Sequence, residues 1–283
     1  GSDAFQETDI IGISMPVTKW SYQITKASEV PVAIAKAFYI AKSGRPGPVL
    51  IDITKNAQFE MFDFNYKKCI GIRSYSPIPK IDKNKILDAA KLINAAKKPL
   101  IVSGQGVILG NAEKEFKSFV EKSGIPAAWT ILGASALPTS HELNVGMVGM
   151  HGNYGPNILT NQCDLLIAIG MRFDDRVTGD TNSYAKQAKI IHLEIDPVEI
   201  DKNIKVDVPV LGDCKESLAM LSKNIKTKSY KNWLKTFDDL MKKEFNKVIK
   251  NDLSPKKKGL TMGESIIAIN KFTKGKAIIV SDV

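Results

Sequence analysis

The chain has 283 residues, of which 43% are hydrophobic, so it is long enough for one to two domains with a sizeable core. No apolar run approaches the roughly 20 residues that span a bilayer, and the polar residues 1–6 are followed by no apolar stretch of the secretory kind. We therefore expect a cytoplasmic protein without membrane association; its three cysteines, Cys69, Cys163 and Cys214, fit no metal or disulfide spacing.

The formal net charge of +10 raises the question of a nucleic-acid partner. Most of the excess positive charge lies in residues 221–258, which contain twelve lysines and four acidic residues. The same stretch carries an apolar stripe at helical spacing, formed by Trp233, Phe237, Leu240, Met241 and Val248. Because no aromatic residues are interleaved with the lysines as in base-stacking surfaces, we predict a helix with a solvated lysine face and no nucleic-acid partner.

Residues 1–60 have the pattern of the end of an α/β domain. Ser28 can cap a helix that begins near Pro31 and stops at Gly44. The apolar face expected for this helix comprises Val30, Ile34, Ala37, Phe38 and Ala41. Residues 48–53 follow as a short buried strand. So few elements cannot bury a core alone, and we expect the domain to begin upstream of this sequence.

Residues 61–80 include Pro77 and Pro79 and show little periodicity, which is typical of a linker. From Ile81 onward, apolar runs typical of strands alternate with helical patterns, which indicates βαβ units and a parallel sheet covered on both faces. The predicted strands are 100–102, 125–129, 165–169, 190–193 and 208–211, and the predicted helices are 86–96, 112–122 and 215–226. Another helix is expected at 262–272 and another strand at 277–280, as the start of a further α/β unit.

Glycines and charged side chains follow four of these strands, in residues 103–106, 170–176, 194–197 and 212–213. In open α/β sheets, ligands bind outside the carboxyl ends of the strands. Glycines let a phosphate approach the backbone, arginine forks suit a pyrophosphate, and carboxylates suit ribose hydroxyls. The four strand ends together predict a dinucleotide site.

Each of these strand ends also has a purely structural interpretation. The glycines can form plain tight turns, the charged residues in 172–176 can form a salt-bridge cluster, and Glu194 and Asp196 can cap the helix that follows them. Other catalytic constellations are absent: His141, His151 and His192 have no metal-ligand spacing, and neither a Gly-x-Ser-x-Gly elbow nor a Walker A loop occurs. We expect no metal site.

Four segments resemble the acetohydroxyacid (acetolactate) synthase large subunit. They are Asp3-Ala4-Phe5-Gln6-Glu7, Ser43-Gly44-Arg45-Pro46-Gly47-Pro48-Val49-Leu50, Gly149-Met150-His151-Gly152 and Arg172-Phe173-Asp174-Asp175-Arg176-Val177-Thr178-Gly179. The Gly-Arg-Pro-Gly-Pro motif occurs across decarboxylases that use thiamine diphosphate (ThDP), whereas the Arg-Phe-Asp-Asp-Arg run is more specific to the FAD-containing synthases. The spacing between the segments also fits, so the resemblance covers essentially the whole chain.

The resemblance implies an α/β fold in which a Rossmann-like central domain with a parallel sheet is flanked by parts of two ThDP-binding α/β domains. Residues 1–60 would end the pyrimidine-binding domain, 61–80 would be a linker, and 81–228 would be the FAD-binding domain. Residues 229–283 would form a connecting helix and the start of the diphosphate-binding domain. The chain is thus expected to be cut at both ends.

The implied reaction is the decarboxylation of pyruvate and its condensation with a second pyruvate or 2-oxobutyrate, a two-carbon transfer in branched-chain amino-acid (Val, Leu, Ile) biosynthesis. The implied cofactors are ThDP, Mg²⁺ and FAD, the last mainly structural and without net redox change. The implied assembly is a homodimer or higher homo-oligomer, with a small regulatory subunit as a further partner. Because the catalytic glutamate and the magnesium-diphosphate motif of the family would lie outside residues 1–283, the fragment alone is expected to be inactive.

By resemblance, Gln6 and Lys55 lie at the substrate channel of the catalytic site, together with Phe5 and Asp175. The cofactor contacts implied for FAD are Arg45, Gly104, Gly106, Thr130, Leu132, Met150, His151, Gly170, Arg172, Asp174, Arg176, Glu194, Ile195 and Asp213.

The sequence departs from the family near the channel. Thr54 and Asn56 flank Lys55 where Pro and Asp are usual, and Trp20 stands where a His is common, while Glu194 replaces a frequent Asp. These departures concern the channel more than the FAD site. The alternatives are another ThDP- and FAD-type enzyme, such as a glyoxylate carboligase or a pyruvate oxidase, and a nucleotide-binding module without a catalytic role.

Overall fold

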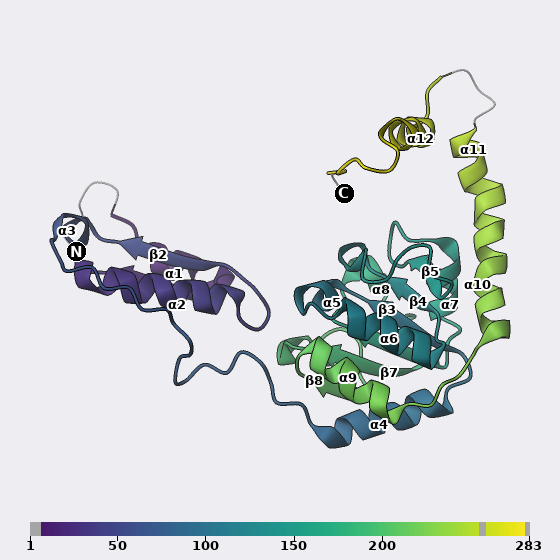
Figure 1. Cartoon of the computed structure of the whole chain (residues 1–283), viewed down its shortest axis with the longest axis horizontal. Coiled ribbons are helices and arrows are strands. Elements are labelled where there is room, and N and C mark those ends of the chain that lie inside the picture. The colour runs from purple at the N-terminus through teal and green to yellow at the C-terminus, as the bar shows by residue number, and fades with distance from the viewer. Residues whose placement is uncertain (1–6, 255–258, 281–283) are drawn as a thin grey trace. The chain divides into compact units, whose positions relative to one another are not determined.

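The computed structural model describes residues 7–254 and 259–280, and its contacts divide the chain into two units, Gly1–Lys80 and Ile81–Val283 (Figure 1). Each unit is described by itself. The predicted Phe5 and Gln6 lie outside the described residues. No helix in the described ranges is long and apolar enough to cross a membrane.

The first unit is built on a two-stranded parallel sheet. Its elements are α1 (Ile10–Ser14), a 3-10 turn (Met15–Val17), β1 (Trp20–Ile24), a 3-10 turn (Ala27–Glu29), α2 (Val30–Lys42), β2 (Val49–Ile53) and α3 (Lys55–Phe59). The two strands pair in register from Trp20 opposite Val49 to Ile24 opposite Ile53. Its buried cluster is small, comprising Ile24, Ala33 and Ala57. Two strands with so little core are marginal by themselves.

Two expectations for α2 are wrong. Ser28 lies inside the preceding 3-10 turn, and the position before the helix is Glu29, whose side chain makes no capping bond. Phe38 is 63% exposed rather than part of the packed face. The buried residues of α2 are mainly small ones, Pro31, Ala33, Ala35, Ala37 and Ile40. Alanines allow the helix to lie close to β1 and β2, and a phenylalanine would not fit in that space.

The second unit contains a six-stranded sheet in which every neighbouring pair is parallel. Its strands are β3 (Pro99–Ser103), β4 (Ala127–Trp129), β5 (Asn144–Met147), β6 (Leu165–Ile169), β7 (Lys189–Glu194) and β8 (Val208–Leu211). The spatial order is β5-β4-β3-β6-β7-β8. Counted from β3 as the first strand, this is the order 3-2-1-4-5-6 of dinucleotide-binding folds. The predicted α/β fold with a parallel sheet is confirmed.

Helices cover both faces of this sheet. The helices of this unit are α4 (Lys83–Ala95), α5 (Gln105–Leu109), α6 (Glu113–Ser123), α7 (Tyr154–Thr160), α8 (Asp175–Thr178), α9 (Cys214–Asn224), α10 (Lys231–Glu244), a π-helix (Phe245–Ile249), α11 (Lys250–Leu253) and α12 (Met262–Thr273). Short 3-10 turns occur at Ile131–Gly133 and Pro197–Glu199.

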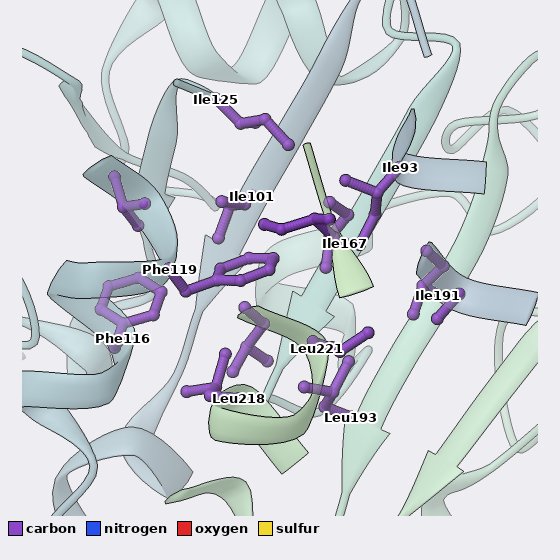
Figure 2. Close-up of a cluster of buried hydrophobic side chains, with 14 of the residues drawn as sticks. Ile93, Ile101, Phe116, Phe119, Ile125, Ile167, Ile191, Leu193, Leu218 and Leu221 are labelled. Carbon is purple, nitrogen blue, oxygen red and sulfur yellow. The ribbon is translucent and has the colours of Figure 1, made fainter. Parts of the chain in front are cut away.

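Alternation along the strands divides the core into two layers, because successive strand residues point to opposite faces. On one face, Ile101 and Ile167 pack against Phe119 of α6 and Leu218 and Leu221 of α9 (Figure 2). The other layer contains Leu100 and Leu166 with residues of α7 and α10, which are Leu159, Trp233 and Phe237. The result is a three-layer α/β/α arrangement.

The lysine-rich stretch forms the predicted helix with a solvated lysine face. Trp233 and Phe237 are buried, and the indole N–H of Trp233 donates to the carbonyl oxygen of Pro99 at 2.9 Å. Its lysines from 231 to 250 are exposed. The predicted stripe stops short of Val248, which is 63% exposed. The π-helix explains this difference, since its wider turn shifts the phase of the residues that follow α10.

The predicted strand at 277–280 is wrong. These residues have no regular secondary structure, and Ile278 and Val280 are 93% and 91% exposed. Their β-branched composition favours a strand, but a strand forms only where a neighbour completes its backbone hydrogen bonds. No named strand of the described residues pairs with them. The helix expected just before them does form, as α12.

The packing in Figure 2 gives a stability test. Phe119 is fully buried, so Phe119→Ala should lower the free energy of unfolding by about 3–5 kcal/mol. Leu87 lies on α4 and is 46% exposed, so Leu87→Ala should cost less than about 1 kcal/mol. Urea titration of this chain followed by circular dichroism measures both. Equal losses for the two variants would contradict the assigned core.

Candidate functional site

Most of the described residues predicted for the site follow strands at the carboxyl edge of the six-stranded sheet, where the chain order reverses between β3 and β6. The backbone N–H of Gly104, after β3, donates to the carbonyl oxygen of Ile169 in β6 at 2.9 Å. The N–H of Gly106 donates to the carbonyl oxygen of Gly170 at 2.8 Å. The turns after β3 and β6 are therefore joined directly through their backbones.

Glycine is required at this junction for contact between the two turns. A Cβ on Gly104 would lie 2.4 Å from the carbonyl oxygen of Gly170, and one on Gly106 would lie 2.6 Å from the Gly170 Cα. Gly170 itself has a φ of +57°, a conformation that glycine adopts without strain. These close approaches account for all three glycines structurally. They also leave no room for a further side chain between the turns after β3 and β6.

The charged run after β6 forms two ion pairs. Arg172 Nη2 lies 3.1 Å from Asp174 Oδ2, and Arg176 Nη1 lies 3.6 Å from Asp175 Oδ2. The Arg172 side chain is 50% exposed, so it keeps donors that face solvent. The other carboxylate oxygen of Asp174, Oδ1, is buried and has no hydrogen-bond partner among the described residues. A buried unpaired carboxylate oxygen is costly unless a donor from elsewhere meets it.

The Gly149–Gly152 segment lies against this charged run. The backbone N–H of Met150 donates to the carbonyl oxygen of Arg176 at 2.8 Å. Gly149 has a φ of +107°, and a Cβ there would lie 2.8 Å from the same oxygen. Met150 is 63% exposed, and His151 is also exposed. Two motifs that are separate in the sequence thus form one surface.

At the ends of β7 and β8, carboxylates bind nearby backbone. Glu194 is buried, and its Oε1 accepts from the N–H groups of Ile195 at 2.9 Å and Asp196 at 3.2 Å. Asp196 accepts from the N–H of Val198, and Asp213 caps α9 by accepting from the N–H of Glu216. The capping interpretation therefore holds for Asp196, and Asp213 has the same role. The cap uses one oxygen of Asp213 and leaves the ligand-site interpretation of this strand end open.

Exposed apolar side chains border the same edge. Thr130 follows β4 and is buried, with its N–H donating to the carbonyl oxygen of Ser103 at 2.9 Å. The next two residues, Ile131 and Leu132, are 65% and 57% exposed. Met150 after β5 and Val198 after β7 are exposed as well, so exposed apolar side chains follow three strands at this edge. Exposed apolar groups beside charged ones are typical of ligand or partner surfaces.

Two of the described residues predicted for the site belong to the first unit. Arg45 follows α2 and its carbonyl oxygen accepts a hydrogen bond from Lys19 Nζ at 2.9 Å. Lys55 begins α3 and is exposed. The carboxyl edge of the second unit brings together the other described cofactor-site residues and Asp175.

Burial keeps two of the cysteines protonated. It raises the pKa of the Cys163 thiol to about 12. The pKa of Cys214 is also raised, by burial first and then by the carboxylates of Asp213, Glu194 and Glu115. A nucleophilic cysteine needs the opposite shift, so neither thiol suits covalent chemistry. In the described parts of the chain, no group of three His, Cys, Asp or Glu residues could hold a metal ion.

A depression of about 480 Å³ lies at the opposite, amino edge of the sheet. It is lined by Lys97 and residues 229–233, next to the start of β3. None of the residues predicted for the site lies in it. Its lining has no glycine turn and no carboxylate, so it lacks the groups that suit a dinucleotide.

Sequence reasoning missed three asparagines that shape the loops after β4 and β5. Asn144 Oδ1 accepts from the indole N–H of Trp129, and Asn153 Oδ1 accepts from the N–H of Met147. Asn157 pairs with both backbone groups of Gly149. Asparagine is common in turns, but the partner of each amide becomes visible only in the folded chain.

Comparison with known proteins places residues 86–221 in the family described as thiamine pyrophosphate enzyme, central domain. The acetolactate synthase large subunit of Corynebacterium glutamicum is 48% identical over 226 residues, which cover 80% of this chain and 36% of that protein. The one of Buchnera aphidicola is 37% identical over 292 residues, covering 100% of this chain and 50% of that protein. The one of Lactococcus lactis is 36% identical over 285 residues, covering 100% and 48%. The chain spans half or less of the length of these relatives.

The glycine junction gives a test of the site geometry. Gly106→Ala places a Cβ 2.6 Å from the Gly170 Cα and should lower the free energy of unfolding by about 1–3 kcal/mol. The matched control is Gly155→Ala in α7, where the nearest atom would be at 3.5 Å and alanine favours the helix. Thermal unfolding of both variants measures the difference. A neutral Gly106→Ala would mean that the two turns are not in contact.

Proposed function

Because the chain belongs to the acetolactate synthase large-subunit family, we propose that the whole protein is an acetolactate synthase. It would decarboxylate pyruvate and condense the product with a second pyruvate or with 2-oxobutyrate, for the synthesis of branched-chain amino acids. The observation that carries the proposal is the 36% identity that extends over 100% of this chain in the Lactococcus lactis protein, and similar identity in relatives that share its name.

We propose that the carboxyl edge of the six-stranded sheet holds FAD. The strand order supports this, because ligands of such sheets bind where the order reverses. The exposed apolar side chains of Ile131, Leu132 and Met150 suit a flat aromatic ring system, and the exposed donors of Arg172 suit a pyrophosphate.

The hydrogen bonding of Asp174 indicates whether the residues present fit such a cofactor. Its Oδ1 is buried without a partner among the described residues, while Oδ2 pairs with Arg172. A hydroxyl or amine of a nucleotide would supply the missing donor, so the residues present fit a dinucleotide. The flavin contacts implied by resemblance at Gly104, Gly106 and Glu194 stay proposals, since their polar groups or close packing already serve the fold.

In this scheme, residues of the chain would bind the cofactor and the 2-oxo acid and orient them. Bound ThDP supplies the carbanion chemistry that a 2-oxo acid needs for decarboxylation and carbon-carbon bond formation. Arg172 would hold phosphate oxygens, and the glycine junction would exclude side chains from their path. The exposed ammonium of Lys55 would attract the carboxylate of a 2-oxo acid. The assignment of Gln6, Phe5 and Asp175 to the substrate channel rests on the family resemblance and is part of this proposal.

Partners of the whole protein are also part of the proposal. The relatives are named large subunits, which suggests a second, smaller subunit with a regulatory role. We also propose a homodimer or higher homo-oligomer. The first unit supports association, because Ile13, Met15, Val17 and Phe59 are more than 60% exposed in it.

The activity can be tested on the complete protein supplied with ThDP, Mg²⁺ and FAD. Pyruvate should be converted to acetolactate, which acid treatment turns into acetoin for colorimetric detection. Turnover of glyoxylate instead, or oxygen-dependent oxidation of pyruvate without acetolactate, would show that the protein is a different enzyme of the ThDP class. Flavin absorbance in the purified protein separates the synthase from a domain that binds no nucleotide.

The FAD site can be tested through Arg172→Ala. A hydrogen bond to a charged group contributes roughly 1.5–3 kcal/mol, so FAD should bind about ten- to a hundredfold more weakly in the complete protein. The melting temperature of the FAD-free protein should change little, because a half-exposed ion pair adds only about 0–1 kcal/mol.

The control for this experiment is Arg73→Ala, which removes an exposed arginine of the first unit. Arg73→Ala should leave the FAD dissociation constant and the melting temperature of the FAD-free protein unchanged. If Arg172→Ala lowers the melting temperature and leaves the FAD dissociation constant unchanged, Arg172 serves only its pair with Asp174.

A further inference from the structure

The Gly149–Gly152 segment has little to hold it in one conformation. It lies outside the named helices and strands, and glycine occupies both of its ends. Gly149 has a φ of +107°, and the Met150 side chain between the glycines is 63% exposed. Glycine loses more conformational freedom on ordering than other residues. Specific bonds are therefore needed to fix where Met150 and His151 lie.

Asn157 supplies two of these bonds from α7. Its Oδ1 accepts from the backbone N–H of Gly149 at 2.9 Å, and its Nδ2 donates to the carbonyl oxygen of the same residue at 2.9 Å. The amide thus pairs with Gly149 as one strand residue pairs with another. Only a side chain with both a donor and an acceptor can do this, so aspartate cannot replace it at neutral pH.

The segment is held on its other side by α8. The N–H of Met150 donates to the carbonyl oxygen of Arg176, and the missing side chain of Gly149 lets that oxygen approach. Met150 is thereby fixed between Asn157 and the run that contains Arg172 and Asp174. These bonds connect residues that the family resemblance assigns to one cofactor.

The start of α7, the helix that carries Asn157, is anchored to the sheet and to α10. Glu244, the last residue of α10, accepts from the N–H of Tyr154 at 3.0 Å and from Asn153 Nδ2 at 3.4 Å. Asn153 in turn accepts from the N–H of Met147 in β5 at 2.9 Å. Leu159 on the same helix is fully buried. The helix that carries Asn157 is therefore rigidly placed.

We propose that Asn157 is a positioning residue for the flavin site: it holds Met150 and His151 where they contact the cofactor, without touching the cofactor itself. This inference rests on the proposed FAD site at the carboxyl edge. Asn157 would raise the affinity for FAD because it orders the Gly149–Gly152 segment before FAD binds, so that less conformational entropy is lost on binding.

The test uses Asn157→Asp in the complete protein, with Asn232→Asp as the matched control. The substitution at position 157 would keep the acceptor, lose the donor and bring a charged oxygen against the carbonyl of Gly149. Asn232 undergoes the same chemical change at an exposed position on α10. FAD dissociation constants, FAD-free melting temperatures and acetolactate production at rising FAD concentration are measured for both.

We expect Asn157→Asp to weaken FAD binding about five- to fiftyfold, from one lost hydrogen bond and a newly unpaired carbonyl. Saturating FAD should restore production to near the wild-type level, which a misfolded variant would not show. Asn232→Asp should match the wild type in all three measurements. Asn157→Ala, which removes both bonds without adding charge, should also weaken FAD binding and be rescued by excess FAD.

Two outcomes would overturn the inference separately. If the wild type binds FAD and both Asn157 variants bind it equally well, Asn157 has no positioning role, while the proposed FAD site stands. If the wild-type protein binds no FAD, the proposed site fails and this inference fails with it.

Discussion

Parallel pairing between β3 and β6 forces the turns after these two strands into contact, and the loops of the site depend on that contact. Gly104 and Gly106 bind the backbone of residues 169–170 at distances that exclude a side chain. The chain leaves this junction as the Arg172–Arg176 run, and the Gly149–Gly152 segment then packs on its end through Arg176. The buried His192 holds the start of this run in place, because its Nε2 hydrogen-bonds to the carbonyl oxygen of Met171 at 2.8 Å. Local geometry at one sheet edge thus brings the proposed flavin contacts of the second unit together.

Much of the central sheet could be predicted because its strands are buried on both faces and so appear as continuous apolar runs. The strands at 165–169 and 208–211 have the predicted bounds, and those at 99–103 and 189–194 extend them by one or two residues. The edge strand β5 was missed, since Asn144–Met147 is short, mixed in polarity and pairs with β4 through a register shift. The strand predicted at 277–280 was wrong for the opposite reason. The composition of this segment favours a strand, but a strand pairs only where a neighbouring strand is present.

The candidate site, too, could be predicted only in part from the sequence. Strand ends are visible in a sequence, so the glycines, the Arg172–Arg176 run and Glu194 could be located without a structure. The partners of their side chains could not be. Asp213 proves to be a helix cap, Glu194 binds the backbone beside it, and the pairing of Asn157 with Gly149 joins residues whose relation no periodicity reveals. Family resemblance added the choice of FAD among dinucleotides, which strand-end chemistry alone left open.

The claim that the carboxyl edge of this sheet holds FAD is tested most directly by amide hydrogen exchange of the complete protein with and without the cofactor. FAD should slow exchange in residues 104–106, 130–132, 149–152 and 170–176. Exchange should be unchanged at the amino edge, around Lys97 and residues 229–233, which line the depression of about 480 Å³. Protection at the amino edge, with no change in the turns after β3 and β6, would contradict the account.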